Sequence, residues 1–123
     1  MKVYLSLPIS GHDLKASETY AYRQCALLHM AHPDYTIINP FVIASKVHKQ
    51  KMQRTHTLDP PTYEEYMQAD LRELATCDMA YFCPDWQTSE GCKTEMALCR
   101  DKDIPVRFVP SVVVPRRPLN NPP

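Results

Sequence analysis

The hydrophobic and polar positions divide the chain into alternating segments with strand-like and helix-like patterns. A continuous apolar run over residues 2–7 (KVYLSL) predicts a first strand that is buried on both faces. Apolar residues then recur at helical spacing, which predicts a helix that starts at an Asp13 cap and stops before Pro33. A second short apolar run, residues 35–39 (YTIIN), predicts the next strand.

The second half of the chain repeats this alternation. The capping-box sequence T-x-x-E, from Thr62 to Glu65, predicts the start of a helix that ends near Cys77. Ser89 is a suitable cap for another helix, which runs to about Arg100. Apolar runs predict further strands over residues 79–83 and 104–109 and, as a candidate fifth strand or edge extension, over residues 112–114.

A strand, a helix and a strand at these spacings form a βαβ unit, whose right-handed crossover places two strands side by side in parallel. We therefore expect an α/β fold, a flavodoxin- or Rossmann-like three-layer sandwich around a mainly parallel sheet of four or five strands. One domain, residues 1–114, accounts for the pattern. The Pro- and Asn-rich tail, residues 115–123, cannot build a core, and we expect it to be disordered or laid over a neighbouring subunit.

Residues 41–61 have the least regular pattern in the chain. They carry three lysines, one arginine and two histidines against a single acid, Asp59, and are compatible with a short helix over residues 44–52. Two interpretations stay open. The segment is either a lid or anion-attracting loop beside a pocket, or a solvated excursion with ordinary lysines.

Composition narrows the choice of partners. The chain has 14 basic and 14 acidic residues, and this balance gives no support for nucleic acid or an anionic membrane as the main partner. No apolar run approaches the roughly 18–20 residues that a membrane helix needs, so we expect a cytoplasmic protein. The five cysteines form no C-x-x-C pair and the five histidines are scattered, so we expect reduced thiols, no metal site and no cofactor.

The stretch of residues 83–99 (CPDWQTSEGCKTEMALC) joins a strand end, a turn and a helix start. In an open α/β sheet, ligands bind beyond the carboxyl ends of the strands, where helix N-termini offer free N–H groups to an anion. Ser89 lies at such a terminus and Glu95 lies in the second turn, a combination that suits a phosphorylated sugar. The alternative is a capped surface helix with a solvated glutamate.

If the first strand lies beside the third, the loops after them border one crevice. Its expected members are Tyr4, Ser6, Ser10, Gly11, Asp85, Ser89 and Glu95. Asp70 is a further candidate, because a carboxylate in mid-helix at the margin of an apolar stripe needs a partner; an exposed helix acid is the alternative. Two carboxylates in different environments can divide the roles of nucleophile and acid.

Three motifs resemble the nucleoside 2-deoxyribosyltransferase-like superfamily. The opening VYLSLPISGHD, followed by a helix and INP, is similar to the YLSGPISG opening of its small uncharacterised branch. The pattern D-L-x-x-L-x-x-x-D, which starts at Asp70, resembles the segment before the third strand. Ser89, Gly91 and Glu95 resemble the S-x-G-x-x-x-E element of 2′-deoxynucleoside 5′-phosphate N-hydrolases. The three motifs lie in the family's order across residues 2–100.

This resemblance implies cleavage or transfer of an N-glycosidic bond in a (deoxy)nucleoside or nucleoside 5′-monophosphate. Glu95 would be the nucleophile at the anomeric carbon, Asp70 would orient the sugar or pass a proton to the base, and Tyr4 would position Glu95 by a hydrogen bond. The resemblance also implies a homo-oligomer, a dimer or larger. The residues that would contact the substrate are Ser6, Ile9, Ser10, Gly11, Asp85, Ser89 and Gly91.

The chain departs from the family pattern at a few positions. Leu7 stands where the pattern has glycine, and Glu90 and Lys93 stand where relatives are often apolar or glycine-rich. The glycine-rich phosphate motif of the lysine-decarboxylase-like phosphoribohydrolases is absent from the sequence. Two other function classes therefore stay open: a non-catalytic nucleotide-binding or sensing module, and a structural or interaction protein that uses the basic segment and the proline-rich tail.

Overall fold

A computed structural model describes residues 1–9 and 11–110. The predictions for Ser10, for a strand over residues 112–114 and for the tail lie outside these residues. The described elements are, in chain order, β1 (Lys2–Ser6), α1 (Leu14–Ala31), β2 (Thr36–Ile38), α2 (Pro40–Thr55), α3 (Tyr63–Leu74), β3 (Met79–Phe82), the 3₁₀ turn η1 (Trp86–Thr88), α4 (Glu90–Asp101) and β4 (Val106–Phe108).

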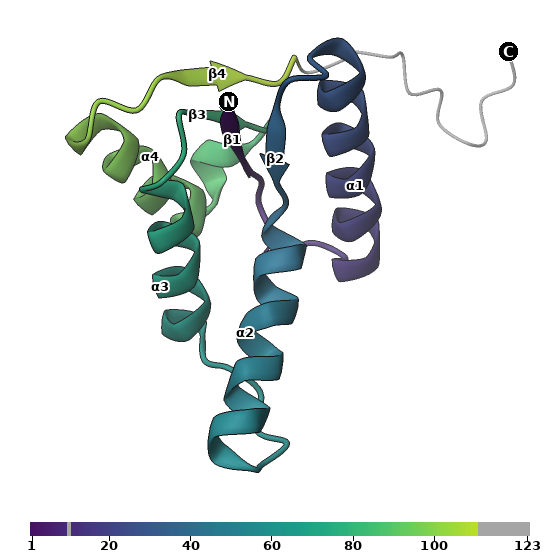
Figure 1. The fold of residues 1–123 in the computed structure, drawn as a ribbon, viewed down its shortest axis with the longest axis vertical. Coiled ribbons are helices and arrows are strands. Elements are labelled where there is room, and N and C mark those ends of the chain that lie inside the picture. The colour runs from purple at the N-terminus through teal and green to yellow at the C-terminus, as the bar shows by residue number, and fades with distance from the viewer. Residues whose placement is uncertain (10, 111–123) are drawn as a thin grey trace, which may run out of the picture.

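The four strands form one parallel sheet in the order β2-β1-β3-β4 (Figure 1). β1 is central, and Tyr4 pairs with Ile38 of β2 on one side and with Ala80 of β3 on the other. The predicted α/β class is therefore confirmed, and the first and third strands are adjacent, which is the condition for the expected crevice. This order places the loops after β1 and β3 next to each other at the carboxyl edge of the sheet.

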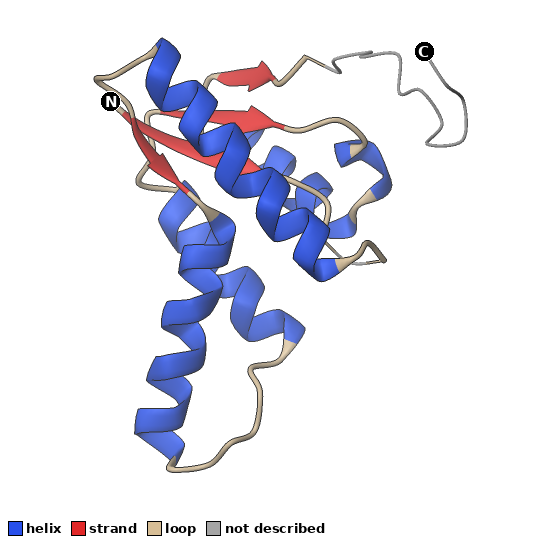
Figure 2. Cartoon of the chain, turned by 90° about the vertical axis from the view of Figure 1, so that its right-hand side faces the viewer, coloured by secondary structure: helices blue, strands red, loops and turns tan. Residues whose placement is uncertain are grey.

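The helices lie on both faces of the sheet and make three layers. Among the described helices, α1 covers one face and crosses the strands obliquely (Figure 2), where Ala21 packs with Leu5 of β1. Helices α2, α3 and α4 cover the other face around Tyr4 and Phe82. Because side chains alternate along a strand, Tyr4 and Ser6 of β1 point toward α4, while Leu5 points toward α1.

Residues 40–55 form a long helix, α2, which contains the short helix considered over residues 44–52 and extends beyond both of its ends; the prediction that this segment is irregular was wrong. Pro40, which directly follows the predicted second strand, occupies the first helical turn, where a missing N–H costs nothing. Asn39 caps the helix by accepting a hydrogen bond from the Phe41 amide at 2.9 Å. Figure 1 shows α2 continuing past the carboxyl edge of the sheet, with α3 beside it.

The connection between α2 and α3 is fixed by charge and by capping. Lys51 donates to Glu65 at 2.7 Å, so at least one of the basic residues of this segment is bound within the chain. The capping box predicted at Thr62 is confirmed, because its hydroxyl accepts from the Glu65 amide and the Glu65 carboxylate accepts from the Thr62 amide. Among the described helices, none is long and apolar enough to cross a membrane.

Candidate active site

The candidate site is built around Glu95, which lies in the second turn of α4 and is only 5% exposed. Ser89 caps α4 as predicted, and its Oγ accepts a hydrogen bond from the Cys92 amide at 3.2 Å. The buried face of the helix carries Cys92, Glu95, Met96 and Cys99. Helical spacing therefore turns a carboxylate toward the sheet, among apolar side chains. The alternative of a solvated glutamate is excluded.

Both carboxylate oxygens of Glu95 accept hydrogen bonds from β1. The Tyr4 hydroxyl donates to Oε2, and the Ser6 hydroxyl donates to Oε1 at 2.7 Å. Tyr4 and Ser6 are two positions apart on one strand, so both side chains leave the same face of the sheet. The hydrogen bond from Tyr4 that the family resemblance implies is thus present in the structure.

Burial sets the protonation of the two carboxyl groups in this region. It raises the pKa of Glu95 to about 7, against the opposing effect of the hydrogen bonds from Tyr4 and Ser6. It also raises the pKa of Asp70 on α3 to about 8, and the negative charge of Glu95 adds to this rise. The pKa of Tyr4 is raised well above its usual value for the same reasons, burial first. The proton affinities of the two acids are therefore coupled, and both are raised toward neutral pH.

Ser6 lies inside the site but has almost no surface for a ligand. It is 1% exposed, and its Oγ contacts both Glu95 and the Sγ of Cys92, the latter at 3.2 Å. The substrate contact predicted for Ser6 stays a prediction. What the hydroxyl does contact is the carboxylate, which it helps to hold in place.

Gly91 and Ser89 border the site from the first turn of α4. A Cβ placed on Gly91 would lie 3.4 Å from Met67 Sδ and 3.5 Å from the Tyr63 hydroxyl, both on α3. The glycine thus lies where α3 approaches α4 closely. Tyr63 was not among the site residues predicted from the sequence. The missed signal was its spacing of seven residues, or two helical turns, from Asp70.

Tyr63 is the solvent-facing member of this group. It is 55% exposed, while burial of its hydroxyl and the charges of Glu90 and Glu95 raise its pKa. Cys92 was also missed. Its position three residues before Glu95 on one helix face was visible in the sequence, but nothing local showed that Ser6 would reach it.

Three predicted substrate-binding residues lie on loops without a hydrogen bond to Glu95 among the described residues. The side chain of Ile9 packs with the cluster under α1, on the opposite face of the sheet. Gly11 is exposed with φ +81°, a left-handed conformation that glycine adopts without strain. Asp85 also has positive φ, is exposed and makes no capping hydrogen bond with its side chain. The structure therefore brings together Tyr4, Ser6 and Glu95, with Asp70, Ser89 and Gly91 around them.

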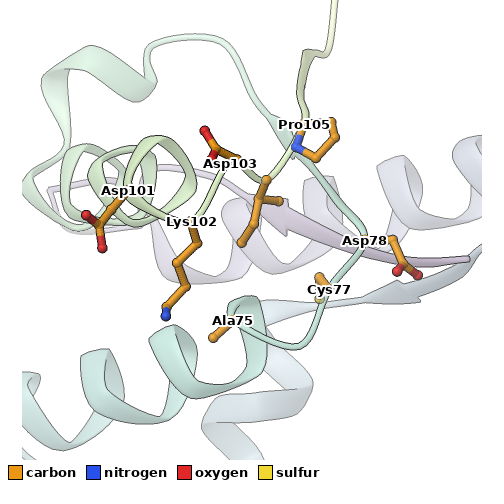
Figure 3. A pocket seen from close by; sticks show the side chains of 8 residues that line it. Ala75, Cys77, Asp78, Asp101, Lys102, Asp103 and Pro105 are labelled. Carbon is orange, nitrogen blue, oxygen red and sulfur yellow. The ribbon is translucent and has the colours of Figure 1, made fainter.

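A cavity of about 600 Å³ lies at the other edge of the sheet, between the end of α4 and the start of β3 (Figure 3). Asp78, Asp101, Lys102 and Asp103 are among its lining residues, and Glu95 is not. Asp78 accepts the Lys2 amide at 2.7 Å, which ties the chain before β3 to the start of β1. No group of three or more metal-binding side chains occurs within residues 1–9 and 11–110.

The comparisons with known proteins add a family and no function. Searches of curated proteins and of solved structures find no match to the chain. The family model described as "Domain of unknown function (DUF4406)" matches residues 1–108, which include every strand and helix described above. The chain therefore belongs to the DUF4406 family.

Proposed function

We propose that the protein cleaves or transfers the N-glycosidic bond of a (deoxy)nucleoside or nucleoside 5′-monophosphate, with Glu95 as the nucleophile. The observation that carries this proposal is the carboxylate of Glu95, buried at the carboxyl side of the sheet between the hydroxyls of Tyr4 and Ser6. A second carboxyl group, Asp70, is near enough for the charge of Glu95 to raise its pKa. The motif resemblance to nucleoside 2-deoxyribosyltransferase-like proteins points to the same chemistry.

The two acids are suited to opposite roles. With pKa values of about 7 and about 8, Glu95 loses its proton at lower pH than Asp70. Glu95 then supplies the anion and Asp70 the acid, the division of labour on which glycosidic cleavage depends. Each oxygen of Glu95 accepts one hydrogen bond and has a second lone pair. The hydroxyls hold the carboxylate in one orientation and leave it able to attack.

The reaction follows from these assignments. A lone pair of Glu95 forms a bond to the anomeric carbon while the bond from that carbon to the base nitrogen breaks, through an oxocarbenium-like transition state. The electron pair of the broken bond stays with the base, and the proton of Asp70 neutralises it. The product is a glycosyl ester of Glu95. Water then gives the free sugar, and a second base gives a new nucleoside.

The test is a base-release assay with deoxynucleosides and their 5′-monophosphates, separated by chromatography. We expect the wild type to release base and Glu95→Gln to lower the rate at least about a thousandfold. Glu18→Gln is the matched control, because Glu18 is exposed on α1, on the opposite face of the sheet. The rate should fall below about pH 7 as Glu95 is protonated, and above about pH 8 as Asp70 loses its proton.

Two results would contradict the proposal. One is a Glu95→Gln protein that releases base as fast as the control. The other is a wild type that binds a nucleotide, with Glu95→Ala binding it equally well, while neither releases base. The second result would favour a non-catalytic binding module on the same fold.

A further inference from the structure

The hydroxyl of Ser6 has two neighbours and one hydrogen. The hydroxyl is within donating distance of both Glu95 Oε1, at 2.7 Å, and Cys92 Sγ, at 3.2 Å, and an ionised carboxylate is the stronger acceptor of its one hydrogen. The Ser6 oxygen therefore contacts the sulfur with a lone pair whenever Glu95 is ionised. A thiol that carries its proton can donate to that lone pair. The result is a chain of two hydrogen bonds, from Cys92 through Ser6 to Glu95.

We propose that Cys92 is a positioning residue, whose thiol donates to Ser6 and thereby fixes and strengthens the hydrogen bond from Ser6 to Glu95. This role adds a residue to the site of the proposed glycosidic function. Only its effect on catalysis rests on that function. The geometry of the three side chains does not depend on the reaction.

The surroundings of Cys92 fit a donor. Cys92 is 1% exposed, and burial raises the pKa of its thiol, so the sulfur keeps its proton at neutral pH. Its own backbone amide donates to the Ser89 cap, which fixes where the side chain leaves α4. Ser6 is equally buried, so water does not compete for the second lone pair of its oxygen.

The same thiol serves both protonation states of Glu95. When Oε1 carries a proton, it donates to the Ser6 oxygen, and the Ser6 hydrogen turns to the sulfur, which then accepts it. Sulfur is a weak donor and a weak acceptor, so it permits both arrangements. Alanine at this position permits neither. Serine permits both, has nearly the volume of alanine, and so isolates the hydrogen bond from the packing.

The proton affinity of Glu95 reports on this chain of hydrogen bonds. Other groups also face Glu95 and must stay constant between variants. The groups whose pKa or hydrogen bonds couple them to Glu95 are Tyr4 and Ser6 of β1, Tyr63 and Asp70 of α3, and Cys92 and Cys99 of α4. Replacing Cys92 alone leaves the charged and titratable members of the other elements in place.

The experiment is a ¹³C NMR titration of the glutamate carboxyl groups in the full chain without substrate, with the Glu95 signal assigned by its loss in Glu95→Gln. It compares Cys92→Ala with Cys92→Ser, and Cys25→Ala is the control on the other face of the sheet. We expect Glu95 to bind its proton about two- to threefold more tightly in Cys92→Ala than in Cys92→Ser. Serine supports both arrangements, but the one with the ionised carboxylate is charge-assisted and therefore gains more from the second hydrogen bond.

The same pair of substitutions in a Ser6→Ala background should give equal proton affinities, since the chain of hydrogen bonds then has no middle member. Equal affinities in the wild-type background would overturn the proposal, as would a difference that persists without Ser6. If Cys92→Ala does not fold, Cys92→Val takes its place as the variant without a donor. Because no substrate is present, a failed base-release assay leaves this result unchanged and removes only the catalytic consequence.

Discussion

Replacing Asp70 with asparagine should make the protein more stable, by an amount that grows with pH. Burial, and then the charge of Glu95, raise the pKa of Asp70 from 3.8 to about 8. Among the described residues, no hydrogen bond joins the Asp70 side chain to a partner. The substitution therefore removes an ionisable group from a partly buried position without removing a hydrogen bond.

The magnitude follows from the two pKa values. Between about pH 4 and pH 8, the folded protein keeps a proton on Asp70 that the unfolded chain has released. The raised pKa therefore contributes stability at low pH that is lost as the pH rises, by about 1.4 kcal/mol for each pH unit. From pH 5 to pH 7 the wild type should lose about 2 to 3 kcal/mol through this group. Asparagine does not titrate, so the difference in free energy of unfolding between Asp70→Asn and the wild type should grow by that amount.

The assay is urea unfolding at pH 5, 6, 7 and 8, followed by the fluorescence of Trp86, the only tryptophan, which packs against Phe82. With a slope of about 1 to 3 kcal/mol per molar urea, the difference in urea midpoint between Asp70→Asn and the wild type should grow by about 1 to 3 M between pH 5 and pH 7. Asp101→Asn, an exposed acid of α4, is the control.

The result that would refute this reasoning is a constant difference between Asp70→Asn and the wild type from pH 5 to pH 7. A constant difference would mean that Asp70 has the same proton affinity in the folded and unfolded chain. That result would contradict both the desolvation of Asp70 in the folded protein and its role as the acid of the proposed reaction.

Two more substitutions test how the site is built. Gly91→Ala should leave the free energy of unfolding unchanged or raise it by up to about 1 kcal/mol, because alanine favours a helix and the new methyl group meets Met67 and Tyr63 at contact distance. Thermal unfolding measures the effect, and a loss of several degrees in Tm would show that α3 cannot accept the methyl group. Thr62→Ala should lower the free energy of unfolding by about 1 kcal/mol, because the amide of Glu65 loses its hydrogen-bond acceptor. A Tm equal to that of the wild type would rule out a stabilising role for the capping box.

The parts of the fold that were predicted correctly rest on local signals. The cap at Thr62 and the apolar run of β1 each act within a few neighbouring residues, so their effect can be read without knowing the fold. The segment that forms α2 lacked such a signal. Its apolar positions are sparse, and Pro40 suits both the end of a strand and the start of a helix. Packing of Ile43 and Val47 on the sheet decided in favour of the helix.

The sequence predicted which residues form the centre of the candidate site, but not all of the contacts between them. The strand order and the alternation of β1 brought Tyr4 and Glu95 together, as the sequence predicted. Ser6 was assigned to the substrate, but in the structure its hydroxyl is enclosed by Glu95 and Cys92. Contacts of this kind join residues 86 to 91 positions apart, and no local pattern reports on them.

The sequence by itself determined the alternation of strands and helices, the parallel sheet and the helix that carries Glu95, because periodicity and capping act over a turn or two of chain. The tertiary structure decided the proton affinity of the two acids. The pKa of Glu95 and the pKa of Asp70 are raised mainly because side chains from distant segments exclude water from both groups, and this loss of solvent exists only when α3, α4 and β1 are packed together.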